Sequence, residues 1–80
     1  MNTVIYEKIK TILVDTLNIS VDEIKPESEL VNDLGINSLE LADLVFNCEE
    51  TFEIDEIDEK SLSKFKTVAD VVEYLEKVID

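Results

Sequence analysis

The chain has 80 residues, with 20 carboxylates against 7 lysines, neither histidine nor arginine, and a formal net charge of −13. This length has room for one domain, over residues 1–80, and not for a deep active site. Without histidine or arginine the chain lacks the usual general base near neutral pH and the forked phosphate clamp. We therefore expect no enzyme activity. The strong negative charge excludes nucleic acid and favours basic protein partners.

Nothing near Met1 resembles a signal peptide, because no basic stretch precedes an apolar run. No apolar segment approaches the roughly 18 residues that a membrane span needs. Cys48 is the one cysteine and cannot form an internal disulfide. These features predict a cytoplasmic protein without membrane insertion, which we expect to be a monomer.

The first predicted element is an amphipathic helix over Thr3–Leu17. Its apolar residues recur every three or four positions and would lie on one helical face. These residues are Ile5, Ile9, Ile12, Leu13 and Leu17.

The next segment, Asn18–Asn37, is long for a connection and has no long helical pattern. Ser20 and Glu23 have the spacing of a capping box for a single turn, which Pro26 would end. Apolar residues recur through the segment, at Ile19, Ile24, Leu30, Leu34 and Ile36. We expect an ordered loop that packs along the core.

A second long helix is predicted to begin near Ser38. Its apolar face consists of Leu41, Leu44, Val45, Cys48 and Phe52. Because Cys48 shares this face, it is predicted to be a small buried residue and not a reactive thiol.

The remaining residues predict one short helix and one long helix. Asp58 is a candidate N-cap for a short helix over Glu59–Leu62, and Thr67 with Asp70 marks the start of a helix that runs to the end of the chain. Ile54, Ile57, Leu62 and Phe65 would anchor the short helix, and the last helix has an apolar face of Val68, Val71, Val72, Leu75, Val78 and Ile79. The predicted fold is all-α, a small four-helix bundle with three long helices and one short helix.

Charge is concentrated in one part of the chain. Residues 26–59 contain 12 carboxylates and no lysine. Such a run is commonly a solvated surface, but its concentration around one helix favours an interaction face for a basic partner. Asp22 with Glu23, or the carboxylates of residues 55–59, would hold a cation weakly at most, and no dedicated metal site is expected.

The segment Asp33–Glu40 contains the only glycine, Gly35, just before the second helix. Asn37 is a good N-cap and Glu40 can reach back toward it, which places Ser38 at the first helical position. A phosphate ester on the Ser38 hydroxyl would be stabilised there by the helix dipole and free backbone N–H groups. Taken alone, the segment also fits an ordinary serine at a helix start.

Residues 33–41 read D-L-G-I-N-S-L-E-L, and with this segment the whole chain resembles an acyl carrier protein. The resemblance extends to E-E-T-F-E-I-D-E-I from Glu49 to Ile57 and to F-K-T-V-A-D-V-V-E-Y from Phe65 to Tyr74. It implies a single acyl-carrier domain whose matching serine, Ser38, receives 4′-phosphopantetheine from coenzyme A through a separate transferase. The arm's thiol then carries acyl groups as thioesters, for fatty-acid or related synthesis. Small residues such as Ala42 and Val45 would leave space for an acyl chain among the helices.

The resemblance also implies which residues meet partner enzymes. Basic patches on the transferase and on enzymes of acyl-chain synthesis or transfer would dock on the start and exposed side of the second helix. The matching positions are Leu39, Glu40, Ala42, Asp43, Phe46, Glu49 and Glu50. Phe46 lies off the apolar face, so it is either an exposed aromatic contact or partly buried at the helix edge.

One residue departs from the family's commonest motif, which has Asp before the serine where this chain has Asn37. The lost carboxylate favours a specialised carrier, and a polyketide, aminoacyl or peptidyl carrier is the alternative within carriers. From another class, an acidic helical adaptor without a prosthetic group also fits the composition.

Overall fold

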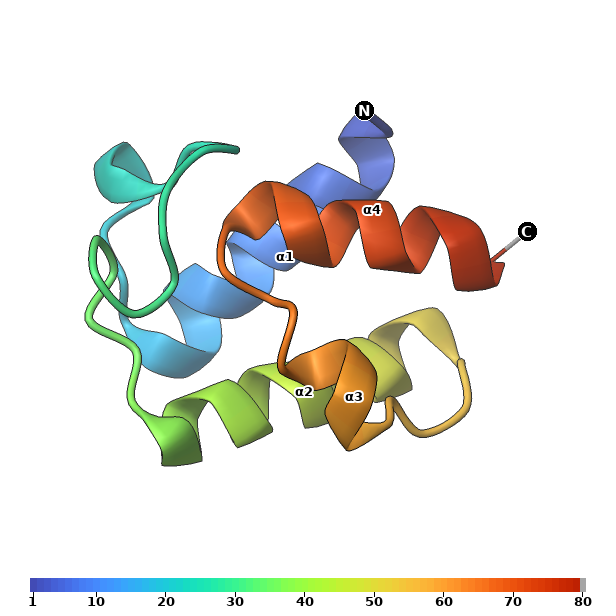
Figure 1. Ribbon diagram of the computed structural model, residues 1–80. Coiled ribbons are helices and arrows are strands. Elements are labelled where there is room, and N and C mark those ends of the chain that lie inside the picture. Colours follow the sequence, from blue (N-terminus) through green and yellow to red (C-terminus); the bar gives the residue numbers. More distant parts are fainter. Residues whose placement is uncertain (80) are drawn as a thin grey trace.

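Four α-helices and one 3₁₀ turn form the regular structure of residues 1–79, the part that the computed structural model describes. The elements are α1 (Thr3–Leu17), the 3₁₀ turn η1 (Val21–Glu23), α2 (Ser38–Phe52), α3 (Glu59–Leu62) and α4 (Val68–Ile79). Figure 1 shows α1 behind α4, with α2 running below α4 and α3 in front of α2. The predicted all-α fold of three long helices and one short helix is confirmed.

A side-chain cap begins α1, and a left-handed residue ends it. The Asn2 side-chain oxygen accepts hydrogen bonds from the backbone N–H groups of Val4 and Ile5, at 3.0 and 3.2 Å. Asn18 ends the helix in the left-handed conformation, with φ of 56°, which asparagine tolerates better than most residues. The helix therefore has the bounds that its apolar periodicity predicted.

The connection between α1 and α2 is ordered, but the proposed Ser20–Glu23 capping box is wrong. The Ser20 side chain makes no cap hydrogen bond, and η1 ends at Glu23, before Pro26. The buried Ser28 organises this turn instead: its hydroxyl accepts from the Lys25 N–H (3.0 Å) and donates to the Glu23 carbonyl (2.9 Å). A hydroxyl can make both bonds at once, so burying it leaves no polar atom unsatisfied.

Backbone hydrogen bonds tie this connection to the start of α4. The Leu30 N–H donates to the Lys66 carbonyl (2.9 Å), and the Val68 N–H donates to the Ser28 carbonyl (3.0 Å). Glu29 and Thr67 form an isolated antiparallel bridge between these bonds. The loop that leads to α2 is thereby fixed against the opposite side of the bundle.

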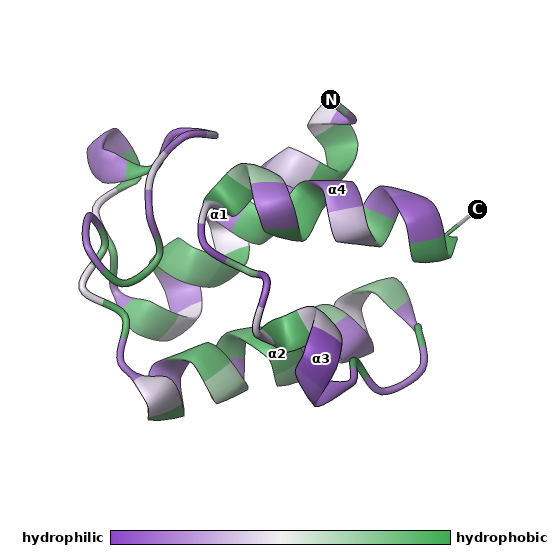
Figure 2. Ribbon diagram, in the orientation of Figure 1, coloured by the Kyte–Doolittle hydropathy of each residue, from purple (hydrophilic) through white to green (hydrophobic). Residues whose placement is uncertain are grey.

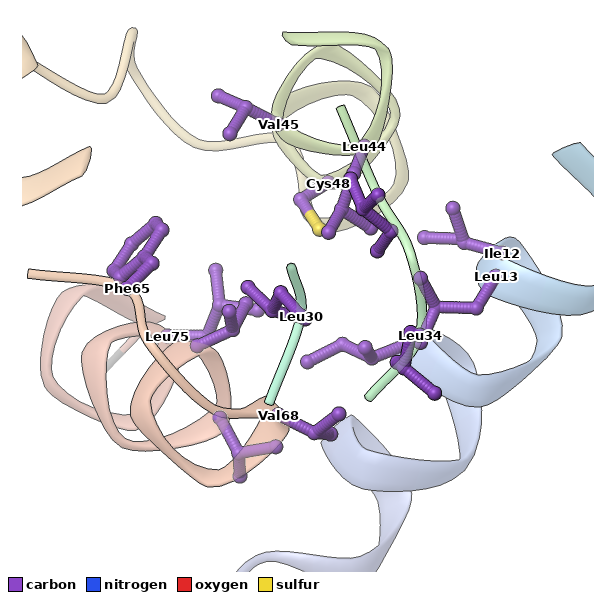
Figure 3. Packing of buried hydrophobic residues seen from close by; sticks show 14 of the residues in the cluster. Ile12, Leu13, Leu30, Leu34, Leu44, Val45, Cys48, Phe65, Val68 and Leu75 are labelled. Atoms are coloured by element: carbon purple, nitrogen blue, oxygen red, sulfur yellow. The ribbon is translucent and has the colours of Figure 1, made fainter. Parts of the chain in front are cut away.

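The core lies between α1, α2, α4 and the long connection. Figure 3 shows Leu30 and Leu34 of the connection among Leu13 of α1, Leu44 of α2 and Leu75 of α4. The five apolar residues predicted to pin the loop are all buried, namely Ile19, Ile24, Leu30, Leu34 and Ile36. Burying aliphatic side chains contributes roughly 1.5–3 kcal/mol each, so the connection is a structural part of the bundle.

Two residues of the predicted apolar face of α4 do not enter the core. Val78 and Ile79 are 43% and 42% exposed, whereas Val68, Val72 and Leu75 are fully buried. Both residues lie in the last turn of α4, at the right-hand end of the red helix in Figure 1. Within residues 1–79, no helix is long and apolar enough to cross a membrane.

The four residues predicted to anchor α3 differ in how deeply they are buried. Ile57 and Phe65 are buried, while Ile54 and Leu62 are partly buried against the core. The Phe65 ring packs edge-on against Tyr74 of α4, with centroids 5.4 Å apart. The short helix is therefore held by the residues that flank it more than by its own side chains.

Candidate functional site

Ser38 occupies the first position of α2 and is exposed. The capping box predicted around it is present. The Asn37 side-chain oxygen accepts from the Glu40 N–H at 2.8 Å, and the Glu40 carboxylate accepts from the Asn37 N–H at 3.1 Å. This reciprocal pair fixes the backbone on both sides of Ser38 and leaves its hydroxyl facing outward.

The approach to Ser38 depends on a left-handed residue. Gly35 has φ of +68°, and an added Cβ would meet no atom within 4 Å. The glycine is therefore needed for its backbone conformation and not for space. The turn inserts Leu34 and Ile36, on either side of it, into the core, and the Ile36 N–H donates to the Leu30 carbonyl at 3.0 Å. Ser38 thus stands two residues beyond a buried anchor.

The start of α2 has donors that fit a phosphate group. Among the hydrogen bonds of residues 1–79, none uses the Ser38 hydroxyl or the backbone N–H groups of Ser38 and Leu39. Two free N–H groups at the positive end of a helix dipole are suited to an anion next to the serine oxygen. A phosphodiester on Ser38 fits these groups without displacing the cap.

Beyond Ser38, α2 presents a continuous exposed face. Leu39, Ala42, Asp43, Phe46 and Glu50 are exposed and follow the spacing of one helical side. Leu39 is 79% exposed and Phe46 is 58% exposed, so the aromatic ring is a surface residue and not an edge of the core. The expectation that Ala42 lines the interior is wrong, because it lies on this outer face, whereas Val45 is buried.

Two carboxylates predicted to meet partners already have partners within the chain. Glu40 belongs to the capping box, and the Glu49 carboxylate accepts from the backbone N–H of Ile57 at 2.7 Å. Both side chains are half-buried, unlike Asp43 and Glu50. The sequence held no signal for the second bond, because the Glu49 partner is a backbone group eight residues along the chain.

The acidic surface has little internal compensation. Across residues 1–79, the one side-chain ion pair joins Lys10 and Glu7 of α1, at 3.2 Å. The 12 carboxylates of residues 26–59 therefore have no cationic side chain as a partner within this part of the chain, although some, such as Glu40, Glu49 and Asp58, accept hydrogen bonds from backbone N–H groups. The same described residues contain no cluster of three or more side chains arranged to hold a metal ion.

Cys48 faces the core between α2 and α4 (Figure 3). Burial, with a smaller contribution from Glu49, raises the pKa of its thiol to about 12. The thiol is therefore protonated at neutral pH and serves as a packing residue, as its position on the apolar face predicted.

Comparison with known proteins gives one family and several curated relatives. The family described as "Phosphopantetheine attachment site" matches residues 7–75. An acyl carrier protein of Syntrophus aciditrophicus is 44% identical over 69 residues, which cover 86% of this chain and 85% of the relative. Acyl carrier proteins of Bdellovibrio bacteriovorus and Wolinella succinogenes are 42% and 44% identical, over 91% and 90% of this chain and 92% and 93% of their own lengths.

Proposed function

The chain belongs to the acyl carrier protein family, and on this premise we propose that Ser38 is the attachment point of its prosthetic group. The protein carries acyl groups on a covalently attached 4′-phosphopantetheine arm, typically in fatty-acid synthesis. The observation that carries the assignment to Ser38 is its exposed hydroxyl at the first position of α2, beside two free backbone N–H groups.

Each residue near Ser38 has a distinct part in this proposal. Asn37 and Glu40 hold the first turn of α2 rigid through the capping box. The free N–H groups of Ser38 and Leu39 would favour the negative charge of a phosphodiester on Ser38. When attached, the arm supplies a terminal thiol that holds acyl groups as thioesters. Attachment through a long arm raises the effective concentration of the acyl group at each enzyme that the carrier visits.

The family implies partners of two kinds, a phosphopantetheinyl transferase and the enzymes that load, extend or remove acyl groups. We infer that these enzymes dock through basic patches on the exposed face of α2. Leu39 and Phe46 would contribute apolar contacts, and Asp43 and Glu50 would contribute charge. Glu40 and Glu49 would add charge from the edge of the same face, although both are engaged in hydrogen bonds within the chain.

The wider role of the chain is part of the same proposal. Residues 1–80 would act as one carrier domain without catalytic activity, as a monomer in the cytoplasm. The composition supports this, because a chain without histidine or arginine depends on other proteins for acid–base chemistry and phosphate binding.

Asn37 supports a second candidate, a specialised carrier for another thioester-based pathway such as polyketide, aminoacyl or peptidyl transfer. Its amide oxygen caps α2 at 2.8 Å, so the cap is kept while a negative charge next to Ser38 is absent. A transferase that serves this chain would then depend more on Asp43 and Glu50 than on a carboxylate beside the serine.

Intact-mass measurement tests the attachment. The protein is incubated with coenzyme A, Mg²⁺ and a phosphopantetheinyl transferase of broad specificity, and one phosphopantetheinyl group should be added. Ser38→Ala should abolish the gain. Ser20→Ala is the matched control, since Ser20 is also exposed at the start of a turn and makes no cap hydrogen bond. A gain that persists in Ser38→Ala would refute the proposal.

A further inference from the structure

A second surface feature lies at the opposite end of α2 from Ser38. A cleft of about 340 Å³ opens between the segment that follows α2 and the last turn of α4. Both segments lie at the right-hand side of Figure 1, the loop below the end of α4, whereas α2 begins at the lower left. Because α2 has 15 residues, this distal cleft is roughly 20 Å from Ser38 along the helix.

The floor of the distal cleft is apolar and only partly covered. It is formed by Phe52, Ile54, Tyr74, Val78 and Ile79. The first three are half-buried against the core, and the last two are exposed although they continue the apolar face of α4. In Figure 2 the end of α4 has the green of hydrophobic residues. The apolar face therefore extends beyond what the fold itself covers.

The rim of the same cleft is acidic. Glu53, Asp55 and Glu56 line it and are exposed. Lys8 of α1 lies near the floor, with its Nζ 5.6 Å from the centroid of the Phe52 ring. Within residues 1–79, however, none of the three rim carboxylates forms an ion pair. An apolar floor with three carboxylates beside it is complementary to an apolar side chain that is flanked by cations.

The backbone conformation of Glu53 is a second, independent observation, because it is unfavourable for the stability of the fold. It ends α2 in the left-handed conformation, with φ of 52°. Glycine or asparagine is favoured at such a helix end, and other residues are strained there. A strained glutamate at this position places a carboxylate at the edge of the cleft. Strained residues of this kind are common where a side chain contacts a ligand or partner.

We propose that the distal cleft is a second docking site, separate from the exposed face of α2, for a protein segment with apolar side chains flanked by lysine or arginine. Apolar side chains of the partner occupy the floor formed by Phe52, Ile54 and Val78. Its cations face Glu53, Asp55 and Glu56. Ser38, the residue proposed to carry the prosthetic group, does not line this site.

The test uses a short synthetic peptide in which a pair of leucines is flanked on each side by lysines. A matched peptide has serines in place of the leucines and the same charge. Backbone NMR of the full chain, titrated with each peptide, should show saturable shifts at Ile54, Tyr74 and Val78 with the leucine peptide. The serine peptide should bind more weakly and without a preference for these residues.

Single substitutions test the acidic rim and the apolar floor of the cleft separately. Glu53→Gln should weaken leucine-peptide binding by roughly two- to fivefold, the range for one exposed ion pair. Val78→Ser should weaken it further, because it removes half of the exposed aliphatic floor. Glu27→Gln and Val31→Ser are matched controls, exposed residues outside the cleft, and should leave binding at the wild-type level.

Glu53→Gly distinguishes a loss of binding from a loss of folding, because this variant should be more stable than wild type. This change should raise the midpoint of thermal unfolding, because glycine suits the left-handed conformation, and it should still weaken peptide binding. Shifts confined to Asp43 and Glu50, equal binding of the two peptides, or an absence of shifts in the cleft at millimolar peptide would each overturn the proposal.

Discussion

The Glu49 carboxylate accepts a hydrogen bond from the backbone N–H of Ile57, with the oxygen 2.7 Å from the nitrogen. The bond joins the last turns of α2 to the segment before α3, and the Ile54 N–H also donates to the Glu49 carbonyl, at 3.1 Å. Glu49 thus holds the acidic connection in place from two of its atoms. Glu49, which was predicted to contact partner enzymes, therefore also stabilises the fold.

This bond predicts different outcomes for two neighbouring carboxylates. Glu49→Ala should lower the free energy of unfolding by about 1–2 kcal/mol, because the Ile57 N–H loses a charged acceptor in a half-buried place. Glu50→Ala should change it by less than about 0.5 kcal/mol, since Glu50 is exposed. Urea unfolding measures both. Equal values for the two variants would show that the Glu49 bond contributes little.

Electrostatic docking on α2 predicts a rate that depends on salt. Asp43→Lys should slow modification by the transferase roughly several-fold at low ionic strength, because a steering charge is reversed on the exposed face. The difference from wild type should shrink as salt rises. Asp15→Lys on α1 changes the net charge equally at an exposed site outside that face. Equal slowing by Asp15→Lys would mean that only net charge matters.

Gly35 predicts a stability effect that arises from the backbone alone. Gly35→Ala should cost about 1 kcal/mol, because φ of +68° disfavours an L-residue while the space for a methyl group is open. A synthetic chain with D-alanine at this position should be at least as stable as wild type, since D-residues prefer positive φ. Thermal unfolding compares the three proteins. A loss of stability with D-alanine would point to crowding instead.

Asp58 predicts a pH dependence at the start of α3. Its side chain accepts from the Ser61 N–H at 2.7 Å, and this bond lowers the pKa of the Asp58 carboxyl below 3.8. A lowered folded-state pKa stabilises the fold above pH 3.8, and this contribution is lost as pH falls through the lower folded value. Wild type should therefore unfold at higher temperature than Asp58→Ala at pH 7, and the gap should narrow below pH 3.8. A gap that is constant with pH would contradict this assignment.

The sequence predicted the helices well because their signals are local. Apolar spacing defined α1, and the pairs Asn37–Glu40 and Thr67–Asp70 marked two helix starts within four residues of chain; both reciprocal caps are present. Ser20 failed as a cap because the buried Ser28, five residues beyond η1, organises that turn instead. Local spacing cannot distinguish such competing partners.

Burial at the ends of helices was harder to predict. Val78 continues the apolar spacing of α4, yet it is 43% exposed and lines an open cleft instead of entering the core. Ala42 was assigned both to the docking face and to the space for an acyl chain, and the rotation of α2 set by Leu44 and Cys48 places it on the outer face. Both outcomes depend on the three-dimensional lengths and rotations of packed helices, which periodicity alone does not contain.

Ser38 is the residue that we propose to carry the prosthetic group. After modification by the transferase, cleavage on the carboxyl side of glutamates should release the fragment Leu30–Glu40, in which Ser38 is the only hydroxyl-bearing residue. Mass spectrometry of this fragment should show the addition of one phosphopantetheinyl group, with the other fragments unchanged. An unmodified Leu30–Glu40 fragment alongside a gain in any other fragment would contradict the account.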